Sequence, residues 1–213
     1  MKILVVAAHP DDEILGIGGT ICKHISLGDK VNICIVTSAY EPNWTKEYIK
    51  GKIEEQKKVD EFIGIKKRIN LELPTVKLNT IPHGEFNKVI TDLVDEINPD
   101  ILYTHFENDL NYDHTLISRA CIVATRPPKK IRLYFFETLS ETEFNNKLFQ
   151  PNTWVDITEF ISKKIKAFEI YKSEIKNYPH PRCGKGIEIL AEKRGIESCI
   201  KYAEAFMLVK DYW

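Results

Sequence analysis

Residues 3–13 read ILVVAAHPDDE, an apolar run that ends in a histidine and two adjacent aspartates. The continuous run from Ile3 to Ala8 predicts a strand that is covered on both faces, as strands of parallel sheets are. His9, Asp11 and Asp12 follow it directly. Because open α/β sheets place their sites at the carboxyl ends of strands, this stretch predicts metal-binding and proton-handling groups at the rim of a sheet.

The pattern that follows alternates helical and extended segments. Helices are expected over 12–27, 45–62, 86–97, 113–124, 158–175 and 185–194. Strands are expected over 31–37, 68–73, 100–104, 131–136 and 202–209, with a short extended segment at 154–157. This alternation is typical of an α/β fold with a mostly parallel sheet, and we expect residues 1–213 to form a single domain.

Charge and hydropathy argue against several classes of protein. Lys and Arg number 30 against 31 Asp and Glu, a formal net charge of −1, so no global basic field favours nucleic acid. No stretch approaches the roughly 20 apolar residues of a membrane span, and Pro10 with the acidic run behind it argues against a signal peptide. The five cysteines include no CxxC pair, which favours reduced thiols and a cytoplasmic location.

A second polar cluster follows the predicted strand 100–104 and contains His105, Asp109, Asn111, Asp113 and His114. The carboxyl ends of parallel strands meet at one edge of a sheet, so residues about a hundred apart can share a site. Two imidazoles and one carboxylate suit a divalent metal, zinc first, with a position left for water. The same donors also accept Fe²⁺, Co²⁺ or Mn²⁺.

Two adjacent aspartates can divide the work of such a site. One binds the metal, while the other faces a water whose pKa zinc lowers to roughly 7. That second carboxylate can take up the water's proton and return it to a leaving amine, which gives hydrolysis of an amide or related acyl bond. Taken singly, Asp12 and Asp113 could instead cap helices, and His9 could be a hydrogen-bonded loop residue. The two clusters together favour the metal site.

The glycines at 16, 18 and 19 invite comparison with a dinucleotide-binding turn, but they do not fit one. His9 to Asp12 occupy the turn in which the pyrophosphate would lie, and acidic groups there repel phosphate. We expect these glycines to allow a helix to pack closely on the sheet. Glu13 is expected in the first turn of that helix, where the dipole favours a carboxylate.

The chain resembles the LmbE-like, or PIG-L, family of metal-dependent deacetylases in motifs spread over nearly its whole length. The first motif, AHPDD-E, is intact over 8–13 and is followed by GGT at 18–20. The second, THxxxDLNxDH, reads THFENDLNYDH over 104–114 and continues as ATRP over 124–127. The C-terminal part matches in YxSE (171–174), PHPR (179–182), GIExLA (186–191), RG (194–195) and YAEAF (202–206). The resemblance implies a Rossmann-like three-layer sandwich with a mostly parallel sheet.

The resemblance also implies roles for the residues that match its motifs. It assigns zinc binding to His9, Asp12 and His114, and the role of general base to Asp11. Asp113 is then expected to fix the loop or to orient an imidazole.

Further residues are expected to contact substrate or to support the site. Many family members have a histidine, thought to stabilise the oxyanion, where this chain has Asn111, which can donate a hydrogen bond but cannot carry the charge. His105 is close enough in sequence to join the site or to support it structurally. His180 and Arg182, in a proline-rich irregular segment, could reach over the pocket to hold a sugar hydroxyl or phosphate, or could belong to a surface loop. Glu137, after the strand 131–136, is a weaker candidate.

The resulting hypothesis is a zinc-dependent hydrolase that removes the acetyl group from an N-acetylated sugar or sugar conjugate, giving acetate and a free amine. The N-acetylglucosamine-like substrate comes from the resemblance. The expected partner is that small molecule, with no nucleic acid or membrane span, and the chain could form a homo-oligomer. The alternatives are a receiver-like magnesium-binding module, which would not need the histidines, and a sugar-binding protein without catalysis.

Overall fold

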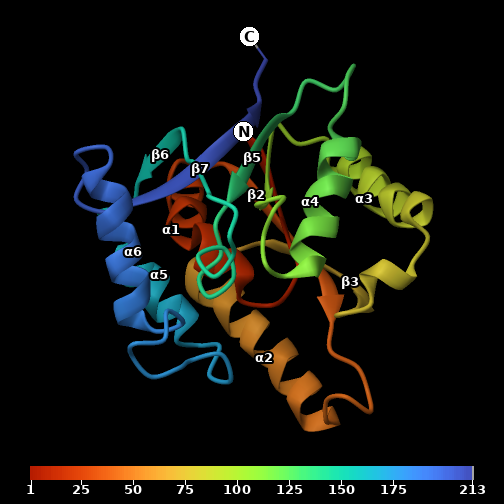
Figure 1. Cartoon of the computed structure of the whole chain (residues 1–213), viewed down its shortest axis with the longest axis horizontal. Coiled ribbons are helices and arrows are strands. Elements are labelled where there is room, and N and C mark those ends of the chain that lie inside the picture. The colour runs from red at the N-terminus through yellow and green to blue at the C-terminus, as the bar shows by residue number, and fades with distance from the viewer. Residues whose placement is uncertain (213) are drawn as a thin grey trace.

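A central sheet organises the computed structural model, which describes residues 1–212 (Figure 1). Within these residues the sheet has seven strands in the order β3-β2-β1-β4-β5-β7-β6. Their bounds are Lys2–Ala7 (β1), Lys30–Ser38 (β2), Lys67–Pro74 (β3), Ile101–His105 (β4), Arg132–Phe136 (β5), Thr153–Asp156 (β6) and Ala203–Lys210 (β7). Strands β1 to β5 pair in parallel, whereas β7 runs antiparallel to both β5 and β6. The predicted α/β fold with a mostly parallel sheet is confirmed.

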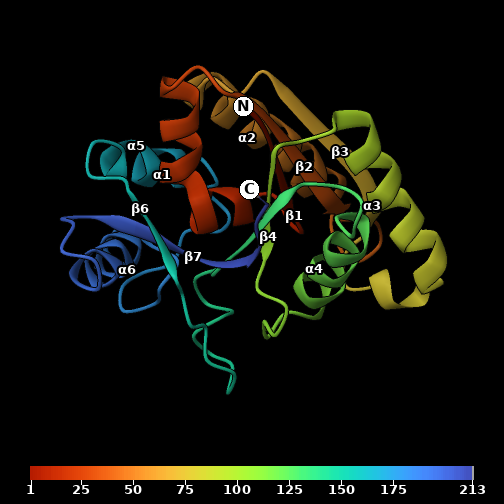
Figure 2. The same ribbon diagram turned by 90° about the horizontal axis from the view of Figure 1, so that it is seen from above.

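Helices cover both faces of the sheet and complete a three-layer sandwich (Figure 2). They are α1 (Asp12–Ser26), α2 (Lys46–Ile63), α3 (His83–Ile97), α4 (Tyr112–Ala124), α5 (Ile161–Phe168) and α6 (Gly184–Ile196), with a short 3-10 helix at Leu78–Thr80. Side chains alternate along β1, so Val5 packs in the core beneath α1, α2, α5 and α6. Val6 packs in the opposite core, beneath α3 and α4. Burial on both faces explains the continuous apolar run of β1.

The close approach of α1 to the sheet depends on its glycines. A Cβ at Gly16 would overlap the ring of Phe136, and one at Gly19 would lie 2.8 Å from Ile157 Cβ. The helix is also irregular at Ile17, where φ is −137° and ψ is 22°. The glycines therefore serve helix–sheet packing, as the sequence predicted.

The helix expected over 158–175 is the main error of the sequence-based assignment. Only Ile161–Phe168 is helical, and turns follow it. The side chain of Tyr171 is fully buried, and its hydroxyl donates to Glu13 Oε1 at 2.7 Å. The apolar period continues to Ile175, but the chain leaves the helix and places Tyr171 in the core, a contact that local periodicity does not encode.

The strand order reverses direction between β1 and β4, which lie side by side although they are far apart in sequence. A crevice forms at such a switch point, at the carboxyl ends of the strands. Both predicted polar clusters follow these two strands. Among residues 1–212, no helix combines the length and apolarity needed to cross a membrane.

Candidate metal centre and active site

Three donor atoms predicted to bind metal converge where β1 and β4 end. His9 Nδ1 lies 3.0 Å from Asp12 Oδ2, and His114 Nε2 lies 3.2 Å from the same oxygen. The two imidazole nitrogens are 3.3 Å apart. The side chains of Asp12 and His114 are fully buried, whereas that of His9 is 24% exposed. The triangle of donors is therefore open to solvent on the side of His9.

This triangle has the dimensions of a divalent metal site. A tetrahedral zinc with bonds of about 2.0–2.1 Å holds its ligand atoms about 3.3–3.4 Å apart. The other carboxylate oxygen of Asp12, Oδ1, is buried and has no hydrogen-bond partner among the described residues. Such an orphaned acceptor is rare unless an ion or water satisfies it. The residues fit zinc, and the same donors fit ferrous iron, cobalt or manganese.

Each imidazole of the triangle carries a carboxylate on its outer nitrogen. His114 Nδ1 lies 2.9 Å from Asp109 Oδ2, and His9 Nε2 lies 3.4 Å from Asp113 Oδ2. Asp113 also accepts a hydrogen bond from the backbone N–H of Val76 at 2.7 Å. Such carboxylates fix the ring orientation and raise the basicity of a metal-binding histidine. Asp109 belongs to the polar cluster expected after the strand 100–104, where no role was predicted for it. Its spacing of five residues from His114, on the loop that enters a helix, is a signal for this contact.

In the metal-free triangle, the neighbouring carboxylates favour protonated imidazoles at the position where a metal would bind. Burial disfavours the imidazolium, but Asp12 and Asp113 outweigh it and raise the pKa of His9 to about 10. Against the same burial, Asp12 and Asp109 raise the pKa of His114 to about 9. Burial opposes ionisation of Asp12 as well, yet the two imidazoles hold its pKa well below the ordinary range. A metal must therefore displace protons to bind.

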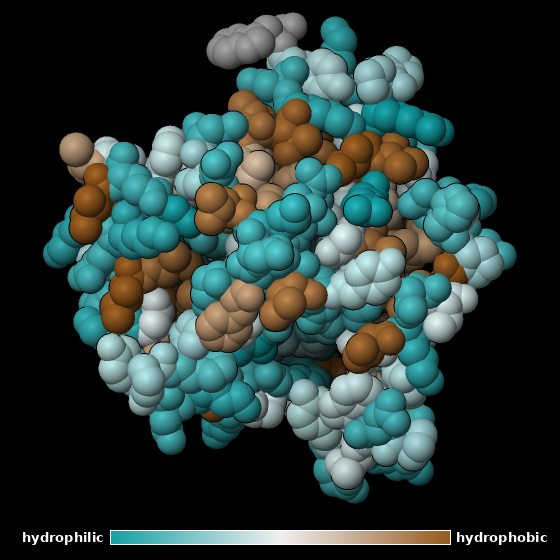
Figure 3. Space-filling view, viewed as in Figure 1, coloured by the Kyte–Doolittle hydropathy of each residue, from teal (hydrophilic) through white to brown (hydrophobic). Residues whose placement is uncertain are grey.

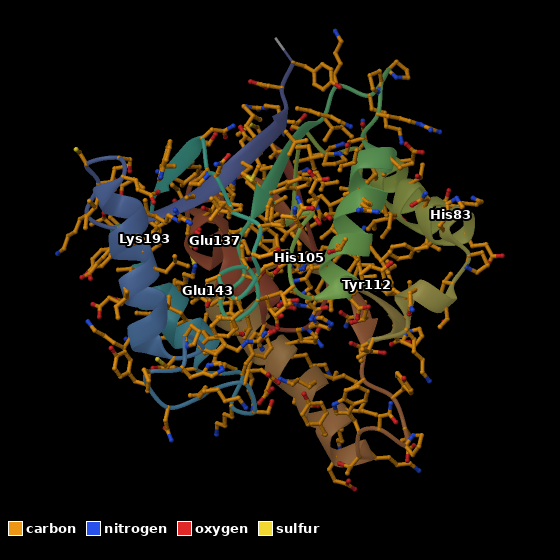
Figure 4. All side chains as sticks on the ribbon, viewed as in Figure 1. His83, His105, Tyr112, Glu137, Glu143 and Lys193 are labelled. Carbon is orange, nitrogen blue, oxygen red and sulfur yellow. The ribbon has the colours of Figure 1, made fainter. Side chains whose placement is uncertain are left out.

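His105 packs against the triangle, and both of its ring nitrogens are already hydrogen-bonded. Its Nε2 accepts from the backbone N–H of Ala8 at 2.8 Å, so its Nδ1 carries the proton that is shared with Thr138 Oγ1 at 3.2 Å. Its ring stacks on that of His114 with 3.7 Å between centroids. His105, Asp109 and His114 lie close enough to hold a metal. The hydrogen bonds to Ala8 and Thr138, however, occupy both ring nitrogens of His105 and leave it no lone pair for a metal. Figure 4 shows His105 near the centre of the molecule, at the end of β4.

Asp11 sits in a strained backbone conformation beside the triangle. Its φ is +125°, a region that residues other than glycine rarely adopt, and it is 2% exposed. Its backbone N–H donates to Glu13 Oε2 at 3.0 Å, and Glu13 in turn pairs with Arg68 at 3.1 Å. Burial raises the pKa of Asp11 well above its ordinary value, although Arg182 opposes the shift. Strain of this kind persists where surrounding contacts over-determine the local structure, often at active sites.

Arg182 lies next to Asp11 and is surrounded by carboxylates. Its Nη1 is 3.1 Å from Asp11 Oδ2 and 3.3 Å from Glu174 Oε2, and its Nη2 is 3.5 Å from Glu141 Oε1. Glu174 also forms an ion pair with Lys52 at 2.6 Å. Burial opposes ionisation of Glu174, but Lys52 and Arg182 hold its pKa below the ordinary value. Arg182 was predicted from the sequence, whereas Glu174 was not, although it belongs to the YxSE segment over 171–174.

The alternative in which the aspartates only cap helices is wrong. The N-cap of α4 is Asn111, whose side chain accepts from the backbone N–H of Asp113 at 3.1 Å. Asp12 lies inside α1, and its Oδ2 accepts from the backbone N–H of His9 at 2.8 Å. Asn111, expected near the site, thus holds the start of α4 and also lines the adjoining cavity.

The polar contacts of His180 and Glu137 are made with residues outside the triangle. His180 Nδ1 accepts from the backbone N–H of Arg182 at 3.1 Å, so it shapes the loop that carries the arginine. Glu137 forms a two-pronged ion pair with Arg194 at 2.6 and 2.7 Å. Figure 4 shows Glu137 on the side of the molecule where Lys193 of α6 lies.

A cavity of about 460 Å³ adjoins the triangle and has the size of a small-molecule site. His9, Asp11 and Arg182 form its inner wall, and residues of α2 and β3 form the outer part. The arrangement places metal-binding groups, a buried carboxylate and a paired arginine around one concave space.

Comparisons with known proteins agree with this geometry. Residues 4–125 match the family model described as PIG-L, GlcNAc-PI de-N-acetylase. The chain is 24% identical to a probable N-acetyl-alpha-D-glucosaminyl L-malate deacetylase 2 of Bacillus anthracis, over 81% of this chain and 80% of that protein. It is also 24% identical to a diacetylchitobiose deacetylase of Thermococcus kodakarensis, over 98% of this chain and 83% of that protein.

Solved structures share the fold. The conserved protein TT1542 from Thermus thermophilus superimposes with a TM-score of 0.81 at 24% identity, covering 99% of this chain and 96% of that one. The 4-carboxy-2-hydroxymuconate hydratase GalB from Pseudomonas putida superimposes with a TM-score of 0.76 at 21% identity, covering 100% and 97%. The fold thus hosts more than one reaction, whereas the family model also matches the segment that holds both the 8–13 and the 104–114 motifs. The chain belongs to the PIG-L, or LmbE-like, family of deacetylases.

Proposed function

We propose that this protein hydrolyses the acetamido group of an N-acetylated sugar or sugar conjugate of the N-acetylglucosamine type, with a divalent metal, zinc first, and Asp11 as general base. The observation that carries the proposal is the triangle of His9 Nδ1, Asp12 Oδ2 and His114 Nε2 beside the buried carboxylate of Asp11, at the wall of one cavity. The names of the curated relatives support the acetylated sugar as substrate.

His9, Asp12 and His114 would hold the metal. When bound, the metal supplies polarisation of the acetyl carbonyl and acidification of water. Asp11 takes a proton from the attacking water while the oxygen of that water bonds to the acetyl carbonyl carbon. The C–N bond then breaks, and Asp11 returns the proton to the amine nitrogen, so the products are acetate and the free amine.

Two further side chains act on this chemistry. Arg182, 3.1 Å from Asp11 Oδ2, holds the base in one orientation and favours its ionised form. Asn111 uses its side-chain oxygen to cap α4, which leaves its amide NH₂ as a donor for the developing oxyanion. That neutral donor would replace the histidine expected from the family pattern.

The proposal is tested by acetate release from a panel of N-acetyl sugars with the zinc-loaded protein. Asp11→Asn should lower turnover by about 10²- to 10⁴-fold while metal stays bound, and His114→Ala should lose the metal by elemental analysis. Asp92→Asn, a matched change on the exposed face of α3, should leave both unchanged. Normal acetate release by Asp11→Asn would remove the base from the proposal. Binding of sugar without acetate release from any substrate would favour the non-catalytic alternative.

We also propose that the chain works as one domain in a reducing compartment, the cytoplasm. One continuous sheet supports the single domain. All five cysteines are free, and four of them are buried, which supports a setting that does not require disulfides.

A further inference from the structure

Glu72 lies on a β-bulge at the outer wall of the cavity. The pairing of β2 with β3 passes from Ile35–Asn70 to Thr37–Leu73, so β3 has one residue more than its partner in this interval. Glu72 falls in it with φ of +55°, a left-handed conformation that side-chain-bearing residues rarely adopt. Bulges next to active sites re-aim side chains, and retained backbone strain there points to function.

The cations that line the cavity are already paired. Arg182 contacts Asp11, Glu174 and Glu141 at 3.1 to 3.5 Å, and Lys52 contacts Glu174 at 2.6 Å. An anionic group on a substrate would therefore have to break an ion pair in order to gain one. The wall offers no unpaired cation among the residues that the structure describes as lining it.

The acceptors of the outer wall, by contrast, are unpaired. The carboxylate of Glu72 makes no ion pair or hydrogen bond with another residue in the described part of the chain. Gln56 also lines the cavity and is only 6% exposed, and its Oε1 is buried with no hydrogen-bond partner within residues 1–212. The buried, unpartnered oxygen of Gln56 is costly, whereas Glu72 is exposed and its carboxylate is free to meet a ligand. This wall therefore suits a ligand that brings hydrogen-bond donors and a positive charge.

We propose that the cavity selects N-acetylated sugars that carry a protonated amine beside the acetylated residue and discriminates against those that carry a phosphate or carboxylate there, with Glu72 as the residue that sets this preference. The inference rests on the proposed deacetylation. An ammonium group supplies three donors and a positive charge, and thus matches both Glu72 and the excess of carboxylates over cations on the cavity wall. The face shown in Figure 3 is mostly hydrophilic, with hydrophobic residues in separate patches.

The test uses three glycosides of N-acetylglucosamine that differ only in charge: 2-aminoethyl, 2-hydroxyethyl and carboxymethyl. With the zinc-loaded protein at low salt, we expect kcat/KM for acetate release to be highest for the amine and lowest for the carboxylate, with about fivefold between neighbours in the series. The differences in kcat/KM among the three glycosides should become smaller at high ionic strength, because Glu72 is exposed and salt screens its charge.

Variants at position 72 assign the preference. In Glu72→Gln, the ratio of kcat/KM for the amine glycoside to kcat/KM for the carboxylate glycoside should fall toward one. Glu72→Asn should lower the same ratio. Because asparagine tolerates positive φ, a result common to both variants would not be due to misfolding at this position. Glu61→Gln, at an exposed position of α2, should keep the wild-type ratio. Equal kcat/KM for the three glycosides in the wild type, or an unchanged ratio in both Glu72 variants, would overturn the inference.

Failure of the proposed function would be distinguishable. If no glycoside released acetate, deacetylation of this class would be refuted, and calorimetry would still measure the binding of the three glycosides to the zinc-loaded protein. Tighter binding of the amine than of the carboxylate, lost in Glu72→Gln, would then support the selectivity. Equal binding would refute it.

Discussion

Asp109 offers a direct test of whether the triangle is a metal site. Its Oδ2 lies 2.9 Å from His114 Nδ1 and 3.2 Å from Thr142 Oγ1, and the residue is 5% exposed. Asp109→Asn keeps the size of the side chain but removes the charge. We expect the variant to fold and to bind zinc more weakly, because His114 loses the partner that orients its ring and raises its basicity.

The expected magnitude follows from the position of the carboxylate. Loss of an outer partner of a metal ligand typically costs 10- to 100-fold in affinity, which corresponds to about 1.4–2.7 kcal/mol. Asp109 is buried and is among the causes that raise the pKa of His114 to about 9. The contact is therefore little screened by solvent, and we expect a loss near the upper end of that range.

The assay is competition for zinc between the protein and a chromophoric chelator at fixed pH. Asp92→Asn on α3, with a side chain 62% exposed, is the matched control and should bind zinc as the wild type does. Thr142→Val removes the hydroxyl contact to Asp109 and also the acceptor of the Thr138 backbone N–H. It leaves the Asp109 carboxylate on His114, so it should lose less zinc affinity than Asp109→Asn. A zinc affinity of Asp109→Asn within twofold of the wild type, with native thermal unfolding, would refute the role of Asp109 and weaken the assignment of His114 as a ligand.

Two further predictions concern packing and protons. Gly16→Ala should lower the free energy of unfolding by about 1–3 kcal/mol in denaturant titrations, because the added Cβ overlaps Phe136. Gly51→Ala is the control: its Cβ meets open space on α2, and the substitution should raise the free energy of unfolding by up to about 1 kcal/mol. Zinc affinity should rise with pH, because the raised pKa values of His9 (about 10) and His114 (about 9) keep both imidazoles protonated at neutral pH in the metal-free protein. Each displaced proton contributes about tenfold per pH unit, and an affinity that is flat between pH 6 and 8 would contradict this.

The sequence predicted the part of the site that depends on strand ends. His9 and Asp12 follow the end of β1 by two and five residues, and His114 follows the end of β4 by nine. The carboxyl ends of neighbouring parallel strands meet at one edge of a sheet. Their convergence could therefore be inferred before any distance was known. The alternation of elements likewise depends on local periodicity, and it was correct apart from the length of α5.

The parts that sequence missed depend on contacts between distant segments. Glu174 reaches Arg182 and Lys52 only because the chain leaves α5 at Phe168 and turns back toward α2. The conformation of Glu72 depends on a register shift between two strands, and no local pattern marks it. Long-range pairing of this kind has no period in the sequence.

The two adjacent aspartates show why residue type alone does not assign a role. Asp12 faces two imidazoles that hold its pKa far below the ordinary range, whereas burial raises the pKa of its neighbour Asp11. The backbone turn at Asp11, with φ of +125°, sends the two carboxylates into these different surroundings. Pairs of carboxyl groups whose pKa values are driven apart commonly divide catalytic roles between them. The strain at Asp11 is thus the structural basis on which one aspartate can hold a metal while the other carries a proton.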